Sequence, residues 1–370
     1  MPSNAGRALR ALGFAALAAG RIRDLGRPWR PPSVCRKNET LRMGGNKKML
    51  TRRMALGLLA APLVASPALA AWPDRPIRLL HGFGPGGTAD ILARLIATPI
   101  GEQLGQSVVV ESRPGAGGNI ASAALARSQA DGHTIGLLTG GHAVSAAFAQ
   151  GLTFDPVNDF DFVSMVVRYA FVIVVRADSP ARDLAGLVAM AKAQPGRVTF
   201  GSAGVGSTHH LVGEMLNAAA GIQMQHVPYR GDAAGTTALL GGEVAAMVTT
   251  SVGVLPHVRA GTLRCLAVSS ATRSKLLPDV PTVAEGAGLP GFEAPTWAGI
   301  AAPKGLPEPV AVRLHQVVAA AINEPAMRRR LDDLVDGEVD AGRPGDMRPF
   351  VAAEITRWRQ VIQRQGIQMQ

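Results

Sequence analysis

The pattern of apolar positions first indicates a strand, a glycine-rich loop and a helix in succession. Ile77, Leu79 and Leu80 form a short apolar run that is typical of a buried strand. Four glycines follow within residues 82–87, and apolar residues then recur at helical spacing after Thr88. The first N–H groups of a helix lack partners and carry a partial positive charge, so an anion can be held at this junction.

The same alternation continues along the chain. Residues 107–111 and 134–139 predict two further strands, with a glycine-rich turn and a short helix between them. A second strand, glycine loop and helix start follow over 197–209. Strands that alternate with helices indicate an α/β fold with a mostly parallel sheet flanked by helices. The second loop suggests two similar halves that face one cleft.

Other segments predict how the halves connect. Residues 171–175 are continuously apolar and indicate a buried strand, and residues 296–303 indicate a strand that returns to the first half. A helix is expected over 179–194, capped by Ser179 or Asp178. Pro99 should kink or end the first helix one turn early. The final helices are expected at 309–323, 325–334 and 347–365.

Charge separates the first 70 residues from the rest. The 370-residue chain has a formal net charge of +11, all of it in residues 1–70, while residues 71–370 are neutral overall. A nucleic-acid partner for the body of the protein therefore loses its main support. Basic residues at 47–53 precede an apolar run and the small residues Ala68 and Ala70, which is the pattern of a secretory signal cleaved after Ala70.

We therefore expect an exported, periplasmic protein with an upstream extension. Residues 1–42 do not fit a signal, so translation is expected to start at Met43 or Met49. Arg52 and Arg53 leave both the general and the twin-arginine export routes open. Cys265 is the only cysteine after the leader, so no disulfide is expected within the mature chain.

A nicotinamide-dependent oxidoreductase is one alternative. Gly82, Gly84 and Gly87 match the G-x-G-x-x-G pattern between a strand and a helix. Glu111 ends the next strand, where an acid would bind the ribose. Against this, Pro85 lies inside the tight turn, the second loop lacks the pattern, and soluble nicotinamide cofactors do not suit an exported protein. We expect no cofactor.

Hydrolysis and metal binding have weaker support. A serine hydrolase needs G-x-S-x-G, and the residues around Ser207 do not have that spacing. His209 and His210 are adjacent on a predicted helix and so point about 100° apart, with no further ligand at metal-binding spacing. What remains is a binding site made of backbone N–H groups and neutral hydroxyls. These hydroxyls belong to Thr88, Thr139, Ser202, Ser207 and Thr208.

Several motifs together carry a family resemblance. They are Phe83-x-Pro85-Gly86-Gly87-x-x-Asp90, residues 113–118 (RPGAGG), residues 201–211 (GSAGVGSTHHL), residues 227–231 (VPYRG), residues 277–285 (LPDVPTVAE) and Arg357-Trp358. In order and spacing, the chain resembles a Bug-type extracytoplasmic solute receptor, the substrate-binding component of tripartite tricarboxylate transporters. The resemblance covers essentially all of residues 72–370.

The resemblance implies a two-lobed periplasmic binding fold with two chain crossings that closes on a small carboxylate. Lobe 1 would comprise residues 72–172 and 296–370, and lobe 2 residues 173–295. A two-component membrane permease would be the partner of a monomeric receptor, and a receptor for sensing is the alternative. With the residues already described, the implied ligand-binding set is Phe83, Gly86, Gly87, Thr88, Asp90, Thr139, Gly140, Ser202, Ala203, Gly204, Ser207, Thr208, Tyr229 and Thr249.

One position departs from the family pattern. Such receptors usually show Met-Phe-Asp after an apolar strand, whereas Met247-Val248-Thr249 stands here. Thr249 would remove a charge from this wall of the site. We therefore expect a plain carboxylate or an aromatic acid, without an amino group near this wall, in preference to an amino acid.

Overall fold

The structure is a computed structural model and describes residues 72–148 and 151–368. The predicted signal peptide, its cleavage position and the predicted translation starts lie outside these residues. The strands are β1 (Ile77–His81), β2 (Val108–Ser112), β3 (Thr134–Thr139), β4 (Phe160–Arg176), β5 (Thr199–Ser202), β6 (Gln225–Pro228), β7 (Ala246–Thr250), β8 (Leu263–Val268) and β9 (Pro295–Pro303).

Helices follow most strands, as the alternating pattern predicts. They are α1 (Thr88–Leu104), the 3₁₀ turn η1 (Ala116–Gly118), α2 (Asn119–Ala126), α3 (Gly140–Phe148), α4 (Leu184–Ala193), α5 (Thr208–Ala220), α6 (Asp232–Gly241), α7 (Ser251–Arg259), α8 (Val283–Gly286), α9 (Glu308–Asn323), α10 (Pro325–Val335) and α11 (Met347–Gln365). No helix in the described ranges is long and apolar enough to cross a membrane.

The strands form two halves with matching order. In lobe 1 the order is β2-β1-β3-β9-β4, with β1 parallel to β2 and β3, and β9 antiparallel to β3 and β4. In lobe 2, β6-β5-β7 run parallel, and β4 pairs antiparallel with β7 and β8. The strand–loop–helix units thus supply the parallel part of each half, as expected, and the long connecting strands supply the antiparallel part.

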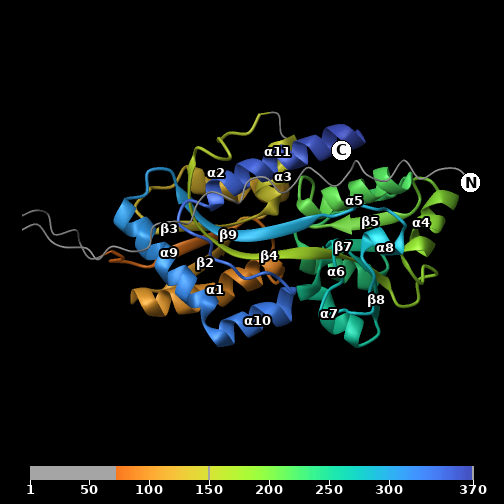
Figure 1. Ribbon diagram of the computed structural model, residues 1–370, viewed down its shortest axis with the longest axis horizontal. Coiled ribbons are helices and arrows are strands. Elements are labelled where there is room, and N and C mark those ends of the chain that lie inside the picture. The colour runs from red at the N-terminus through yellow and green to blue at the C-terminus, as the bar shows by residue number, and fades with distance from the viewer. Residues whose placement is uncertain (1–71, 149–150, 369–370) are drawn as a thin grey trace, which may run out of the picture. The chain divides into compact units, whose positions relative to one another are not determined.

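Strands β4 and β9 run side by side through the middle of the described molecule, with β1–β3 toward one end and β5–β8 toward the other (Figure 1). Residues 160–170 of β4 pair with β9, and residues 171–175 pair with β7. One continuous strand therefore belongs to both halves. The finer prediction of where each lobe begins and ends stays a prediction.

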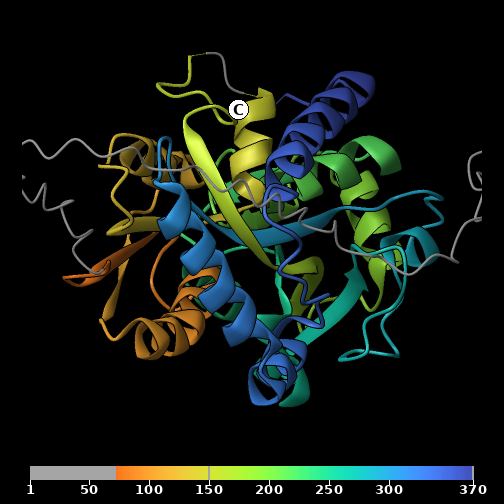
Figure 2. The same cartoon turned by 60° about the vertical axis from the view of Figure 1, so that its left-hand side comes forward.

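Each half is covered by helices on both faces. In lobe 1, Leu79 of β1 packs with α1 and α9, whereas Leu80 packs in the core formed with α2, α3 and α11. Figure 2 shows α9 and α11 on opposite sides of β4. In lobe 2, α6 and α7 cover one face, and α4 and α5 cover the other. Because the strands are buried on both faces, their sequences are continuous apolar runs.

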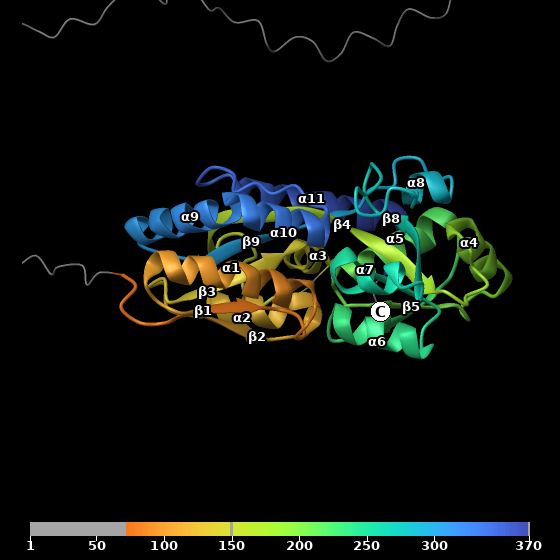
Figure 3. The same cartoon turned by 90° about the horizontal axis from the view of Figure 1, so that it is seen from below.

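The C-terminal helices tie the halves together. Figure 3 shows α9 alongside α1, with α10 continuing toward α7. At that junction the Ser251 hydroxyl, at the start of α7, donates a hydrogen bond to the Leu334 carbonyl of α10 over 2.8 Å. The predicted positions of these helices agree with the structure to within one residue.

Of the two alternatives predicted for Pro99, a kink or an early end of the first helix, the early end is wrong and the kink stays a prediction. Helix α1 continues to Leu104, with Pro99 inside it. Proline removes one backbone hydrogen bond, but the buried face continues on both sides of it through Leu95, Ile96 and Ile100. Packing of this face against the sheet outweighs the loss of that bond.

The predicted cap of the fourth helix is also wrong. Helix α4 begins at Leu184, and the Asp183 carboxylate accepts a hydrogen bond from the Gly186 N–H over 2.7 Å. Ser179 instead accepts from the Ala181 N–H in the preceding turn. Both residue types favour helix starts, so sequence alone could not choose between them.

Candidate functional site

The first glycine loop connects β1 to α1 and is held in shape by Asp90. The Asp90 carboxylate accepts hydrogen bonds from the Gly86 N–H at 3.0 Å and from Arg94, and it lies 3.2 Å from His81 Nε2. Burial would raise the pKa of Asp90, but the hydrogen bonds from Arg94 and Gly86 outweigh it and lower that pKa. Asp90 therefore anchors its own loop as an ionised side chain.

The second glycine loop connects β5 to α5 and is stabilised by two serines. The Ser207 hydroxyl caps α5 by accepting from the His210 N–H, and it donates to the Gly204 carbonyl over 2.6 Å. The Ser202 hydroxyl accepts from the Gly204 N–H and lies 2.6 Å from His226 Nε2. Both hydroxyls are thus engaged within lobe 2.

The loops of the two lobes touch each other directly. The Gly84 N–H donates to the Arg230 carbonyl over 2.8 Å. The Ser145 hydroxyl of lobe 1 donates to the Gly206 carbonyl of lobe 2 over 2.9 Å. A side-chain carbon at Gly84 would lie 2.3 Å from the Arg230 oxygen, which is too close for any residue but glycine. The structure is therefore a closed arrangement of the two loops.

A small cavity of about 20 Å³, room for one water molecule, remains between the lobes. Its walls come from both glycine-loop helices, from β3, β4, β7 and β9, and from α6. The lining residues are Phe83, Thr88, Ala89, Thr139, Gly141, Tyr169, Phe171, Thr208, His209, Asp232, Thr250 and Thr296.

Four of the predicted ligand-binding residues line this cavity: Phe83, Thr88, Thr139 and Thr208. Thr88 and Thr208 are the first residues of α1 and α5, so two helix N-termini from opposite lobes converge here. The Thr208 hydroxyl is buried and has no hydrogen-bond partner within the described protein.

The other predicted residues surround the cavity without lining it. Gly86 and Gly87 lie next to the start of α6, where their added side-chain carbons would be 3.5–3.8 Å from Asp232 and Ala233 atoms. Gly140 contacts two lining residues, because a side-chain carbon at this position would lie 3.2 Å from the Thr208 hydroxyl oxygen and closer still to that of Thr296. The remaining members shape the loops or the wall behind them. They are Asp90, Ser202, Ala203, Gly204, Ser207, Tyr229 and Thr249.

The most informative residues that sequence reasoning missed are Asp232 and His209. Asp232 is the first residue of α6, directly after the 229–231 turn, and is only 4% exposed. An acid at a helix start normally needs no further explanation, because the helix dipole favours it. The His209–His210 pair suggests a metal at most, and a structural histidine is the simpler interpretation of the sequence. Neither residue carried a local signal for the cavity.

The Asp232 carboxylate is the negative centre of the site. His209 Nε2 lies 2.8 Å from Oδ1, at ion-pair distance, although the ring N–H is not aligned for a hydrogen bond. The Thr88 N–H of lobe 1 donates to Oδ2 over 3.3 Å. Burial would raise the pKa of Asp232, but the electrostatic attraction to His209 and the hydrogen bond from the Thr88 N–H lower it to about 2. Burial and this negative charge together raise the pKa of Tyr169.

The expectation that Thr249 favours an acid without an amino group near this wall stays a prediction, but Thr249 has a charged neighbour that the sequence did not indicate. The Thr249 hydroxyl donates to Asp232 Oδ1 over 3.1 Å. The wall therefore does hold a carboxylate, supplied by the start of α6 and not by the end of β7. Thr249 and Asp232 are 17 residues apart in the chain, so the threonine at position 249 gives no indication of the carboxylate beside it.

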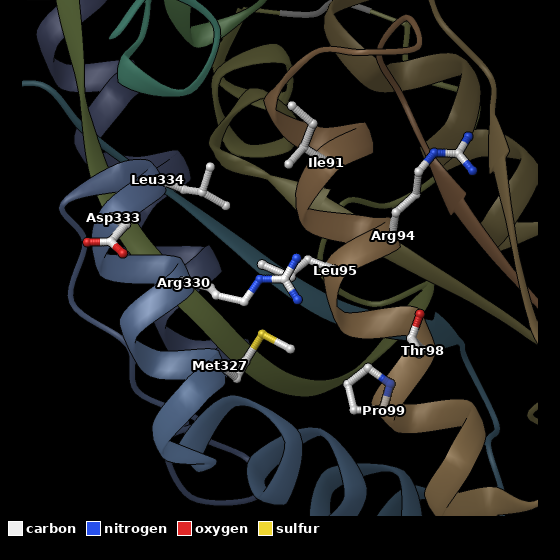
Figure 4. Close-up of a pocket in the computed structure, with 9 residues that line it drawn as sticks. All are labelled: Ile91, Arg94, Leu95, Thr98, Pro99, Met327, Arg330, Asp333 and Leu334. Carbon is white, nitrogen blue, oxygen red and sulfur yellow. The ribbon is translucent and has the colours of Figure 1, made fainter. Parts of the chain in front are cut away.

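A larger groove of about 640 Å³ lies between α1 and α10 and shares no residue with the predicted set. Figure 4 shows Leu95 and Met327 on its walls, with Arg330 extending from α10 toward α1. Arg94 points away from α10 in this view and is engaged by Asp90. The groove is an open, largely apolar surface without converging polar groups. In the described ranges, no three His, Cys, Asp or Glu side chains could share a metal ion.

Comparison with known proteins places this geometry in a family. Residues 92–367 match the model of the tripartite tricarboxylate transporter family receptor. The protein BugT of Bordetella pertussis is 37% identical over 329 residues, which cover 86% of this chain and 99% of BugT.

Two solved structures are similar throughout. The periplasmic binding protein BugD is 31% identical with a TM-score of 0.77, covering 81% of this chain and 100% of BugD. The R. palustris protein Rpa4515, solved with adipate, is 36% identical with a TM-score of 0.76, covering 80% of this chain and 99% of that one. These matches confirm the predicted family and the two-lobed α/β binding fold. The chain belongs to the periplasmic solute-binding receptors of the tripartite tricarboxylate transporter family.

Proposed function

We propose that this protein captures a small organic carboxylate between its lobes and delivers it, chemically unchanged, to a two-component membrane permease. It would act as a monomer in the periplasm after removal of a signal peptide that ends at Ala70. The family match supports the receptor role, and the adipate complex of a similar structure supports a carboxylate ligand.

The convergence of two helix N-termini on one cavity carries this proposal. Thr88 opens α1 in lobe 1 and Thr208 opens α5 in lobe 2, and both line the same space. Helix N-termini favour anions, and backbone N–H groups and hydroxyls can bind a carboxylate without a counter-charge. The unpartnered Thr208 hydroxyl is a donor for such a ligand.

The predicted residues take different parts in this proposal. Phe83, Thr88, Thr139 and Thr208 would contact the ligand, because they line the cavity. The glycines of both loops, Gly140 and Ala203 would allow close approach, and Asp90, Ser202, Ser207 and Tyr229 would hold the loops in shape. The proposed lobes are residues 72–172 with 296–370, and 173–295. The change of β4 pairing after Ala170 supports this division.

The lobes must separate for a ligand to enter. A space for one water molecule is smaller than any organic acid, and the loops around it are in direct contact. Ligand binding would therefore accompany opening and reclosure around β4 and β9, which connect the lobes. This is a hinge motion of the kind that periplasmic binding proteins use.

Calorimetric titration of the purified full chain with small mono- and dicarboxylates tests the proposal. At least one acid should bind and remain unchanged by NMR after incubation, and its amide should not bind. Thr208→Val should weaken binding of that acid about tenfold or more, because a hydrogen bond to a charged group contributes about 1.5–3 kcal/mol.

Thr356→Val is the matched control, since Thr356 is exposed on α11 and bonds only its own helix. It should leave the affinity unchanged. Failure of every carboxylate to bind, or conversion of the bound acid to a product, would overturn the proposal.

A further inference from the structure

The cavity contains one ionised carboxylate, and that group is not part of the expected anion-binding loops. Among the lining residues, Asp232 is the only acid. A site for an anionic ligand would not normally include a buried negative charge, because like charges repel in a low-dielectric interior. Asp232 therefore needs a role that the capture of a carboxylate does not explain.

The protein only partly satisfies this carboxylate. An ionised carboxylate offers about four acceptor positions. Thr249 and His209 approach Oδ1 at 3.1 Å and 2.8 Å. Within the described part of the chain, Oδ2 receives only the long 3.3 Å hydrogen bond from the Thr88 N–H. Because Asp232 lines the cavity, its remaining acceptor capacity is open to a donor on a bound molecule.

The position of the group is defined from both lobes. Thr249 and His209 hold the carboxylate from lobe 2, and Thr88 contacts it from the start of α1 in lobe 1. Phe171 packs edge-on against the His209 ring, with 4.6 Å between ring centroids, and limits its movement. Asp232 is thus a fixed acceptor beside the helix N-terminus proposed to hold the ligand carboxylate.

We propose, on the basis of the proposed carboxylate-binding function, that Asp232 selects acids that carry a hydroxyl or ammonium group next to the bound carboxylate. Such a group donates a hydrogen bond to Oδ2. An acid with a methylene at that position leaves a buried carboxylate facing an apolar group, and sites built to hydrogen-bond a ligand reject analogues that lack the donor.

Matched series of acids test this selectivity. Each series shares a carbon skeleton and differs only at the carbon next to a carboxylate: propanoate, lactate and alanine; succinate, malate and aspartate; 3-phenylpropanoate, 3-phenyllactate and phenylalanine. In the series that the full chain binds, the hydroxy or amino acid should bind at least tenfold more tightly than the plain acid. If the amino acid binds more tightly than the hydroxy acid, the charge of the ammonium group contributes to the selection. If the two bind equally tightly, the hydrogen bond alone accounts for it.

Asp232→Asn should reduce the preference for the amino acid over the plain acid at least fivefold, because the negative charge is lost and the shape is retained. The double variant Asp232→Asn with Thr249→Asp returns a carboxylate to this wall and should regain the preference. Glu354→Gln is the control, since it neutralises a buried acid that bonds Trp358 on α11 outside the cavity. This control should leave the ratio of affinities unchanged.

The outcomes separate this inference from the proposed function. Binding of carboxylates with no preference for the donor, or with a preference for the plain acid, would overturn the role of Asp232 and leave the receptor function intact. That comparison needs only the wild-type protein, so it holds even if Asp232→Asn does not fold. A ratio unchanged in a folded Asp232→Asn would also overturn the inference, and binding of no acid at all would overturn both proposals.

Discussion

At the scale of single residues, a buried histidine links the stability of the fold to pH. His142 is 3% exposed, and its ring contacts the Ser122 hydroxyl at 3.0 Å and the Pro156 carbonyl at 2.8 Å. Burial lowers the pKa of His142 from 6.5 to about 4, and the Pro156 carbonyl only partly opposes this. The unfolded chain therefore binds the proton first as the pH falls. The contribution of His142 to the free energy of unfolding is fully present above about pH 6.5 and is lost as the pH falls from 6.5 to 4.

We expect His142→Gln to flatten the dependence of the unfolding free energy on pH in this window. One preferentially bound proton contributes a slope of up to about 1.4 kcal/mol per pH unit. Urea unfolding at several pH values between 4.5 and 6.5 measures that slope. Ser122→Ala should lower stability and keep the slope, because the titrating ring remains. An equal slope in His142→Gln would contradict the assignment.

The positions of their partners explain why Asp90 and Asp232 have different roles, although both are aspartates with 4% exposure. Asp90 accepts from its own loop and from Arg94 one turn later, so its partners are local in sequence. The partners of Asp232 come from α1, α5 and β7. A pattern within one helix can indicate the first arrangement but not the second.

At the scale of elements, helix caps decide where the helices begin. Asp183→Ala should lower the free energy of unfolding by about 1 kcal/mol, because it removes the hydrogen bond to the Gly186 N–H at the start of α4. Ser179→Ala, at the position first expected to cap this helix, should cost markedly less. Chemical unfolding of the two variants measures both free energies. If Ser179→Ala loses more unfolding free energy than Asp183→Ala, Ser179 would be the cap, as the sequence suggested.

The elements themselves follow closely from the sequence. The glycine loops over 82–87 and 203–207 lie between a strand and a helix as predicted, since their signals are local. The sequence could not decide whether α1 continues past Pro99 or ends there, because the outcome depends on the buried contacts of Leu95, Ile96 and Ile100. The path of β4 through both lobes depends likewise on which strands lie beside it.

At the scale of the whole molecule, the backbones of the two lobes are in contact at Gly84, where its N–H donates to the Arg230 carbonyl. Gly84→Ala should weaken binding of the carboxylate ligand about tenfold or more, because the new methyl group would lie 2.3 Å from the Arg230 carbonyl oxygen in the closed arrangement. The fold of each lobe should remain intact, since the clash arises only between lobes. Calorimetry, with circular dichroism as a check of folding, measures both effects.

Gly253→Ala is the matched control for this experiment. Gly253 lies in α7, and its added carbon would meet only the Thr236 hydroxyl oxygen, at 3.9 Å. It should leave the ligand affinity unchanged. Full affinity in Gly84→Ala would show that ligand binding does not require the loop contact.

A ligand that binds the closed form should also raise the stability of the whole molecule. At a free ligand concentration of 100 times Kd, mass action adds about 2.7 kcal/mol to the free energy of unfolding. Thermal unfolding at increasing ligand concentration should therefore show a rising Tm. A constant Tm at saturating ligand would contradict binding to the native state.

By itself, the sequence determined the fold class, the family, the two glycine loops and the helix starts that carry Thr88 and Thr208. These features depend on hydrophobic periodicity, glycine placement and capping residues, all of which act between neighbours in the chain. Only the tertiary structure placed Asp232 and His209 in the cavity and removed Asp90 from it. Thr88 and Asp232 are 144 residues apart, and a contact of that kind exists only when the two lobes fold and close against each other.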